Sequence, residues 1–511
     1  MKRTSSSGAA EPSKQYFPLR LHIPDLPLDS STDSFLSRFD LWPPTTPRKY
    51  SHRSIPKLTL CAQVRIPLPQ NSPSIEAMPD NPYLSLISSY CDAVLVAPEE
   101  VHRTAMRRAY VHQVVNHVVK TQALIASGED TQSRDQGFTQ ATVLLLVPYK
   151  RFALEIVELL IELHCKGRAK RVSKKSRRKF EDEYSNSEDL QYGDDFKLGL
   201  SLAPRHNMFL YTPFKLSDII IASPLSLSAL LAEDPAASSA LSSIEIMVVD
   251  EAGILLMQNW DHVEAIWEKV NLMPQRDFVT ADISRVREYC LDQRGSEHRQ
   301  SVLISNILTP DINGLIGRSQ SHLGCIKVVP SYAGVLMPGK LHRLRKFECT
   351  PEMVNEERFQ YFTQEFWMKI RDVLPSPAVV FCSSYFEFVR LKNWFETEEP
   401  GVVAISEYTS KPDRQRYLSY VQNDTSRAVL LTERLVYFRH IHVKAAKAVV
   451  LYSLPLHPHI YEEMTKHMTG EEVWMVFCAL DALQLQRLLG DSKAQQLVTS
   501  KGSNFSVNAT S

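Results

Sequence analysis

The sequence predicts an α/β protein of two tandem lobes with parallel sheets, preceded by a proline-rich arm. Strand-length apolar runs alternate with amphipathic helical stretches in two series, divided near residue 336, as expected when crossover helices cover both faces of a sheet. Of the 30 prolines, 13 fall within the first 83 of the 511 residues. With 44% hydrophobic and 23% charged residues, the composition excludes a wholly disordered or fibrous chain.

Residues 1–83 form the predicted arm. Proline fixes φ and removes an N–H donor, so this segment suits neither long helices nor central strands. Apolar side chains nevertheless recur, for example at Trp42-Pro43-Pro44. The pattern leaves two interpretations open, an extended arm that docks on a surface and a disordered segment.

Residues 84–335 form the predicted first lobe. A helix is expected from Arg108 because valines recur at helical spacing over residues 111–119. The expected strands are 142–147, 218–222, 244–249 and 301–305, and the expected helices are 152–163, 225–231 and 255–270.

Residues 336–490 form the predicted second lobe, and residues 491–511 a flexible C-terminal tail. Short apolar runs separated by helix-length stretches again indicate a covered sheet. The expected strands are 378–382, 402–405, 428–431 and 448–452, and the expected helices are 352–370 and 386–394.

A charge-segregated insertion, residues 166–195, interrupts the first lobe. Residues 166–179 hold nine Lys or Arg, and residues 181–195 hold seven Asp or Glu with no basic residue. Blocks of like charge usually stay solvated, so we expect disorder here. The interpretations are a loop whose halves neutralise each other, an RNA-binding element, and a nuclear or nucleolar address in the basic half.

Charge and cysteine usage narrow the class of protein. Lys plus Arg and Asp plus Glu both number 58, so any nucleic-acid contact must be local. The eight cysteines are scattered singly, without a C-x-x-C pair, which predicts a reducing compartment and no zinc site. The longest apolar runs, such as 143–147, are too short to cross a membrane. We expect a soluble intracellular protein with no membrane partner.

Asp250 and Glu251 follow an apolar strand and are the clearest chemical signal. At the carboxyl edge of a parallel sheet, such a pair suits Mg²⁺ and an attacking water in nucleotide hydrolysis, and equally suits the start of a helix. No phosphate loop accompanies it. In segment 334–341, Pro338 removes one of the backbone N–H groups that would bind phosphate, and Leu341 stands where a hydroxyl side chain is needed. Segment 128–139 is acidic and lacks Gly-Lys-Ser/Thr. We therefore predict no catalysis, no metal and no cofactor.

The order of the motifs resembles that of DEAD-box RNA helicases, without the phosphate loop and the arginine-rich motif VI. The matching segments are 146–151 (LVPYKR), 221–225 (IASPL), 249–252 (VDEA), 303–306 (LISN), 380–384 (VFCSS) and 431–434 (LTER). A divergent branch, the U3 small nucleolar RNA-associated protein 25 family, is more similar over residues 78–466. Its signature stretches resemble residues 134–139 (RDQGFT), 217–225 (SDIIIASPL), 256–263 (LMQNWDHV), 384–393 (SYFEFVRLKN) and 431–434.

The resemblance implies two RecA-like lobes with degenerate ATPase motifs. It also implies a nuclear, nucleolar scaffold that works with pre-rRNA, the U3 snoRNA and other proteins of the small-subunit processome in 18S rRNA maturation. The alternatives are an active ATP-dependent RNA helicase and a protein-only adaptor. The residues that the resemblance marks as contacts are Gln258, Asn259, Trp260, Tyr385, Phe386, Thr432, Glu433 and Arg434.

Positive and aromatic side chains interleave in the second lobe and extend this contact set to Arg390 and Lys444. Arginine and aromatic side chains suit phosphate contacts and the stacking of unpaired bases. The aromatic residues of 386–391 also recur near helical spacing, so core packing is the other interpretation.

Overall fold

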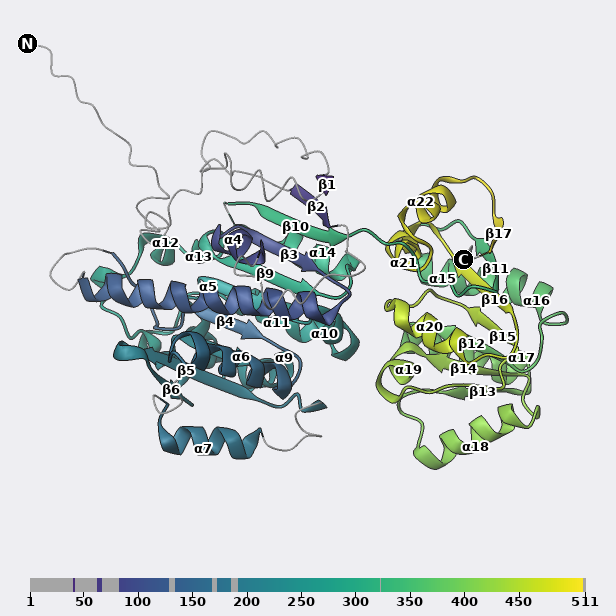
Figure 1. The fold of residues 1–511 in the computed structure, drawn as a ribbon, viewed down its shortest axis with the longest axis horizontal. Coiled ribbons are helices and arrows are strands. Elements are labelled where there is room, and N and C mark those ends of the chain that lie inside the picture. Colours follow the sequence, from purple (N-terminus) through teal and green to yellow (C-terminus); the bar gives the residue numbers. More distant parts are fainter. Residues whose placement is uncertain are drawn as a thin grey trace, which may run out of the picture. The chain divides into compact units, whose positions relative to one another are not determined.

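The computed structural model describes residues 40–41, 62–66, 82–127, 134–167, 172–184, 192–321 and 323–508. The chain divides into two compact units, Met1–Pro330 and Ser331–Ser511, called lobe 1 and lobe 2 below (Figure 1). Each lobe contains one sheet with helices on its faces. The predicted fold class of two α/β units with mainly parallel sheets is confirmed.

Lobe 1 has a ten-stranded sheet in the order β1-β2-β10-β3-β9-β8-β4-β7-β5-β6. The strands from β2 to β7 in this order run parallel, while β1, β5 and β6 pair antiparallel at the two edges. The strands are β1 Asp40–Leu41, β2 Ala62–Ile66, β3 Asp92–Val96, β4 Val143–Leu146, β5 Lys197–Ala203, β6 Asn207–Leu210, β7 Ile219–Ala222, β8 Ile246–Val249, β9 Gln300–Ser305 and β10 Cys325–Pro330.

Helices on both faces bury the lobe 1 sheet in two apolar clusters. The predicted helix 255–270 is in fact two helices, because Asn259 adopts extended backbone and caps the second one. The helices are α4 Pro82–Ser88, α5 Glu100–Ser127, α6 Lys150–Leu163, α7 Lys174–Glu183, α9 Pro224–Glu233, α10 Ala252–Gln258, α11 Trp260–Lys269, α12 Glu288–Leu291, α13 Gly295–His298 and α14 Pro310–Gly317.

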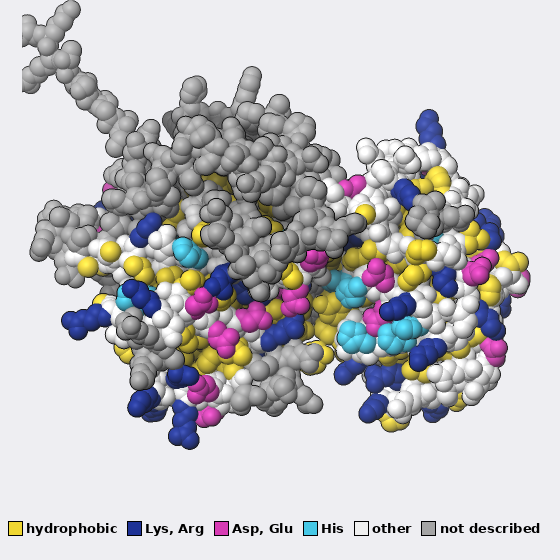
Figure 2. Space-filling view, viewed as in Figure 1, with side chains coloured by type: hydrophobic (Ala, Val, Ile, Leu, Met, Phe, Trp, Pro, Cys, Tyr) yellow, Lys and Arg dark blue, Asp and Glu magenta, His cyan; other side chains and the backbone are white. Residues whose placement is uncertain are grey.

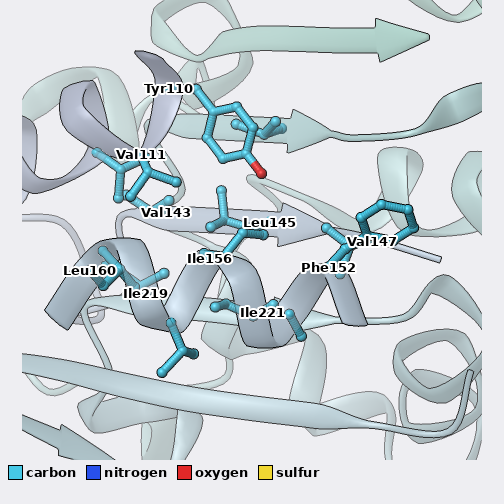
Figure 3. Close-up of a cluster of buried hydrophobic side chains, with 14 of the residues drawn as sticks. Tyr110, Val111, Val143, Leu145, Val147, Phe152, Ile156, Leu160, Ile219 and Ile221 are labelled. Carbon is cyan, nitrogen blue, oxygen red and sulfur yellow. The ribbon is translucent and has the colours of Figure 1, made fainter. Parts of the chain in front are cut away.

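The packing of α6 shows how the apolar pattern sets this core. Phe152, Ile156 and Leu160 recur every four residues, so they share one face of the helix, and all three are buried. Figure 3 shows this face against side chains of β4 and β7, including Leu145 and Ile221. Each such side chain contributes about 1.5 to 3 kcal/mol on burial.

Part of the predicted arm belongs to the lobe 1 sheet. Strand β2 pairs in parallel with β10 over its whole length, and β1 pairs antiparallel with β2. Residues 40–41 and 62–66 thus lie in the lobe 1 sheet, and docking of the arm as a whole stays a prediction. The rest of residues 1–81 lies outside the described part of the chain.

The prediction of disorder throughout the insertion 166–195 is wrong for its middle. Residues Lys174–Glu183 form α7, whose Phe180 is buried and stacks on the buried Tyr184. Both rings belong to the lobe 1 core, so two aromatic anchors hold a highly charged segment in a fixed place. Residues 168–171 and 185–191 lie outside the described part of the chain.

Lobe 2 has a seven-stranded sheet in the order β13-β14-β12-β15-β16-β11-β17, parallel except for β17. The strands are β11 Leu341–Lys346, β12 Ala378–Cys382, β13 Val402–Ile405, β14 Ala428–Thr432, β15 Ala448–Leu451, β16 Glu472–Phe477 and β17 Asn504–Asn508. The helices are α15 Val354–Gln360, α16 Trp367–Ile370, α17 Tyr385–Glu398, α18 Lys411–Gln422, α19 Glu433–Arg439, α20 Pro458–Lys466, α21 Ala482–Leu489 and α22 Asp491–Thr499. A π-helical segment, Tyr361–Phe366, joins α15 to α16.

The prediction of a flexible tail at 491–511 is wrong for most of that segment. Residues Asp491–Thr499 form α22, and β17 closes the sheet against β11. Phe505 and Val507 pack on the lobe 2 core, and Lys346 Nζ donates to the carbonyl oxygens of Val498 and Ser500 at 2.7 and 2.6 Å. Only two apolar residues mark β17 in the sequence, too few to distinguish a strand from a tail.

None of the helices in the described part of the chain combines the length and apolarity needed to cross a bilayer.

Candidate functional site

Asp250 and Glu251 lie where β8 ends, at the carboxyl edge of the lobe 1 sheet. Asp250 N donates to the Leu146 carbonyl of the neighbouring β4 at 2.9 Å. Glu251 is the N-cap residue of α10 and has a φ of +52°, in the left-handed region that few side chains adopt. The two residues are 0% and 2% exposed. The strand-to-helix turn therefore holds two carboxylates inside the protein.

Arg107 of α5 pairs with three carboxylates at once. Its Nε donates to Asp250 Oδ2 at 2.7 Å, its Nη2 to Glu251 Oε1 at 3.1 Å and its Nη1 to Glu155 Oε2 at 2.7 Å. The Arg107 side chain is 1% exposed. A planar fork of N–H donors makes such multiple contacts possible, which a lysine ammonium cannot reproduce.

The remaining contacts involve every oxygen of the carboxylate pair. Arg103 Nε donates to both oxygens of Glu251 at 3.0 Å, and Tyr110 Oη donates to Asp250 Oδ2 at 2.9 Å. Asp250 Oδ1 accepts the backbone N–H of Glu251 at 2.8 Å. We call these five residues, Arg103, Arg107, Tyr110, Asp250 and Glu251, the arginine-clamped pair.

The electrostatics of this cluster keep Arg107 charged. Burial alone would lower the pKa of Arg107, but the carboxylate of Asp250, with Tyr110 and Glu251, outweighs it and raises that pKa above its usual value. Burial, and then Asp250, raise the pKa of Tyr110 well above its usual value, so the phenol keeps its proton. The positively charged Arg107 side chain therefore faces the carboxylates of both Asp250 and Glu251.

A magnesium ion does not fit this arrangement. Magnesium takes carboxylate oxygens that are open to it and keeps several waters. Here all four oxygens of Asp250 and Glu251 already accept hydrogen bonds and are shielded from solvent. The described residues also contain no cluster of three or more His, Cys, Asp or Glu arranged to hold a metal.

Gly253, two residues after Glu251, lies in close contact with a neighbouring side chain. A Cβ built on Gly253 would lie 1.9 Å from Asn306 Oδ1, and Asn306 follows β9 at the same edge of the sheet. The Asn306 side chain therefore occupies the space that any larger residue at position 253 would need.

Segment 334–341, which does not have the sequence of a phosphate loop, has a structural role in lobe 2. Lys340 Nζ donates to the Gly470 carbonyl at 2.6 Å, and β11 begins at the next residue. Gly334 has a φ of +93°, and a Cβ there would lie 2.6 Å from the Leu489 carbonyl carbon. Gly334 and Lys340 thus serve contacts within lobe 2.

Aromatic side chains gather at the carboxyl edge of the lobe 2 sheet. Tyr385 follows β12 and Tyr408 follows β13, and their rings meet edge to face at 4.9 Å between centroids. Phe386 is 86% exposed and Tyr408 is 67% exposed. We call Tyr385, Phe386 and Tyr408 the aromatic edge. Apolar rings in water at a sheet edge are a surface for stacking or docking.

Thr432 and Glu433, predicted as contact residues, are 1% and 0% exposed. Thr432 Oγ1 donates to Glu407 Oε2 at 2.8 Å and caps α19. Glu433 accepts the backbone N–H groups of Leu456 and His457, both at 3.1 Å. These two side chains hold α19 and its neighbouring loops, so direct contact is corrected to a positioning role.

The other predicted contact residues of lobe 2 differ in their exposure to solvent and in their ion pairs. Arg434 is half-buried, with Nε 3.7 Å from Oε1 of Glu407, the residue that precedes Tyr408. Arg390 pairs with Glu356 at 2.7 Å and covers the Phe359 ring at 3.8 Å. Lys444 is exposed on the loop before β15.

The predicted residues of lobe 1 surround the break between α10 and α11. Asn259 is exposed and caps α11 by accepting from Asp261 N at 3.2 Å. Trp260 packs against the lobe 1 core, and Gln258 is half-buried. The structure explains Asn259 and Trp260 by capping and packing, and a contact role for them stays a prediction.

Sequence reasoning missed Arg103, Arg107 and Tyr110, which complete the arginine-clamped pair. They lie 140 or more positions before the carboxylates that they contact, so no local spacing links them to Asp250 and Glu251. The available sequence signal was the spacing of four and then three residues between Arg103, Arg107 and Tyr110, which places these polar side chains on one face of a helix. It also missed Tyr408, whose position just after β13 marked it as a residue of the sheet edge.

Two models of one protein family match this chain in order. The model described as UTP25, NTP hydrolase-like domain, matches residues 90–324, and the model described as Utp25, C-terminal domain, matches residues 341–507. The chain belongs to the Utp25 family. The two matches correspond to lobe 1 and lobe 2, and the predicted resemblance is confirmed.

Relatives in this family are similar over most of the chain. The U3 small nucleolar RNA-associated protein 25 homolog of Xenopus tropicalis is 30% identical, covering 82% of this chain and 60% of that protein. The human homolog is 30% identical, with 81% and 61% covered. Protein NUCLEOLAR FACTOR 1 of Arabidopsis thaliana is 29% identical, with 83% and 64% covered. The chain spans about three fifths of the length of these relatives.

Solved structures with some similarity include DEAD-box proteins. The yeast DEAD-box splicing factor Prp28 has a TM-score of 0.28 at 14% identity, covering 80% of this chain and 74% of that one. A DEAD box protein from Methanococcus jannaschii has a TM-score of 0.24 at 13% identity, with 84% and 92% covered.

Proposed function

We propose that this protein is a nucleotide-independent, helicase-like scaffold that assembles into the small-subunit processome and supports pre-rRNA processing toward 18S rRNA. The names of its relatives, which associate them with the U3 small nucleolar RNA, support the setting. They also support residence in the nucleolus, with pre-rRNA, U3 snoRNA and other processome proteins as partners.

The observation that carries the non-catalytic part is the arginine-clamped pair. A nucleotide-hydrolysing enzyme with an Asp-Glu pair at this sheet edge needs these carboxylates to hold magnesium and to orient a water. In this chain both carboxylates are instead saturated by Arg103, Arg107 and Tyr110. The hydrogen bonds of this turn then hold α5 against the lobe 1 sheet.

The aromatic edge supports the contact part of the proposal. Stacking of an unpaired base on an aromatic side chain contributes about 1 to 3 kcal/mol and tolerates any base. Phe386 and Tyr408 are exposed enough to stack, and Arg434, which pairs with Glu407 next to Tyr408, is the cation proposed to meet phosphate. RNA is therefore the proposed partner of this edge.

Replacement of the endogenous protein by variants in cells tests this function. We expect depletion to lower 18S rRNA while 25S or 28S rRNA is spared, and the double variant Phe386→Ala/Tyr408→Ala to restore 18S rRNA poorly and to cross-link weakly to RNA. Val373→Ala is the matched control, because Val373 is an apolar side chain that is 71% exposed and precedes β12 instead of following it. Normal 18S levels on depletion would refute the proposed setting, and full cross-linking of the double variant would refute the RNA contact.

A further inference from the structure

The surface of α7 is the most strongly charged part of lobe 1 that the proposed function leaves unexplained. Lys174, Lys175, Arg178 and Lys179 are all exposed. In a helix these positions fall within a single stripe, with Lys174 and Arg178 one turn apart and Lys175 and Lys179 likewise. Figure 2 shows Lys and Arg side chains protruding over α7 at the lower left of the view.

The charge of this stripe is not neutralised by the acidic half of the helix. Lys174, Lys175 and Arg178 form no ion pair with any residue that the structure describes, whereas Arg177 pairs with Glu181 at 2.7 Å. Glu183 accepts instead from Tyr211 Oη at 2.7 Å, and Lys179 Nζ lies 4.0 Å from the centroid of the same ring. Within the described residues, Arg177–Glu181 is thus the ion pair that joins the basic and acidic parts of α7, and neutralisation of the two halves of the insertion stays a prediction.

Helix stability does not explain the stripe either. A helix dipole favours acidic residues in the first turn and basic residues in the last, and α7 has the opposite order, with no acidic residue in its first turn and no basic residue in its last. Like charges one turn apart also repel. The arrangement weakens the helix, and the buried Phe180 and Tyr184 offset that cost.

We propose that the basic stripe of α7 is a docking site for the phosphate backbone of RNA, separate from the aromatic edge of lobe 2. A shallow surface hollow, widely open to solvent, is lined by Lys175, Arg178 and Lys179, with Asp182 and Glu183 of the same helix at its C-terminal end. The carboxylates confine an anionic chain to the first two turns. In a protein with no net charge, this fixed local patch attracts phosphate without a field over the whole molecule.

Salt-dependent binding of a labelled, single-stranded RNA of mixed sequence to the full chain tests the proposal. Each phosphate contact contributes about 0.7 to the slope of log K against log salt for a single strand. The triple variant Lys174→Ala/Lys175→Ala/Arg178→Ala should lower the slope by about 2 and bind at least about fivefold more weakly near 0.1 M salt. The control Arg108→Ala/Arg294→Ala/Arg318→Ala removes three lobe 1 cations that already pair with Glu162, Glu297 and Glu264, and should change the slope by less than about 0.5.

Three results would overturn the proposal. One is a slope in the α7 variant equal to that of the unaltered chain, and another is an equal decrease in the control. The third is loss of nuclear entry in a fluorescent fusion of the α7 variant with unchanged RNA binding, which would assign the stripe to an import receptor. The proposal relies on the proposed function only for RNA as a partner, and its failure is distinguishable because Phe386→Ala/Tyr408→Ala reports on the lobe 2 contact alone.

Discussion

Replacement of Arg107 by methionine tests the arginine-clamped pair, because it removes the cation and keeps much of the side-chain volume. Three hydrogen bonds to Asp250, Glu251 and Glu155 are lost, and Asp250, which is 0% exposed, loses its opposing charge. Breaking one partner of a buried ion pair costs about 3 to 5 kcal/mol. Glu251 keeps Arg103, and Asp250 keeps Tyr110 and a backbone N–H, so the lower end of this range is expected.

Native-state hydrogen exchange at the amides of β4 and β8 measures this loss in lobe 1 alone. A cost of about 3 kcal/mol makes exchange through global opening of the lobe faster by roughly 10²-fold. Arg108→Met is the matched control. It is the next residue on α5 and forms an exposed pair with Glu162, which predicts a loss of at most about 1 kcal/mol. An Arg107→Met variant that exchanges like the control would refute the inferred role of the clamp.

Three further predictions concern other parts of the fold. Gly253→Ala should lower the free energy of unfolding of lobe 1 by about 1 to 3 kcal/mol through overpacking, and Asn306→Ala in the same chain should restore most of it, because the clash is with Asn306 Oδ1; thermal melts of the single and double variants measure this. Burial lowers the pKa of His342, so the folded state resists a proton that the unfolded chain binds below about pH 6.5. Lobe 2 should therefore lose stability as pH falls through that value, and urea unfolding between neutral and mildly acidic pH should show a flatter dependence in His342→Gln. Deletion of residues 491–511 should destabilise lobe 2 and expose its core to proteolysis, since it removes α22 and the edge strand β17; an unchanged melting temperature would contradict this.

The central strands could be predicted from the sequence because burial on both faces leaves an uninterrupted apolar run. Ala378–Cys382 and Val402–Ile405 were predicted to the residue. Edge strands carry no such run: β17 has the pattern Asn-Phe-Ser-Val-Asn, in which one face is polar. Its pairing with β11, more than 150 residues earlier in the chain, makes it a strand.

The candidate site was predictable only in part, for the same reason. Asp250 and Glu251 follow a buried strand, which marks the sheet edge locally. Arg107 lies in α5, and only the tertiary packing of that helix brings it to Asp250. In α7, charge density favoured a solvated loop, and two buried rings, Phe180 and Tyr184, outweighed it.

Equilibrium binding of magnesium-ATP to the full chain, with and without single-stranded RNA, tests the central claim most directly. Because the carboxylates of Asp250 and Glu251 accept hydrogen bonds from arginine and the sequence contains no Gly-Lys-Ser/Thr segment, we predict no saturable heat of binding up to a Kd of about 1 mM, and no release of phosphate. Saturable binding in the micromolar range, or RNA-stimulated phosphate release that Glu251→Gln abolishes, would contradict a nucleotide-independent scaffold.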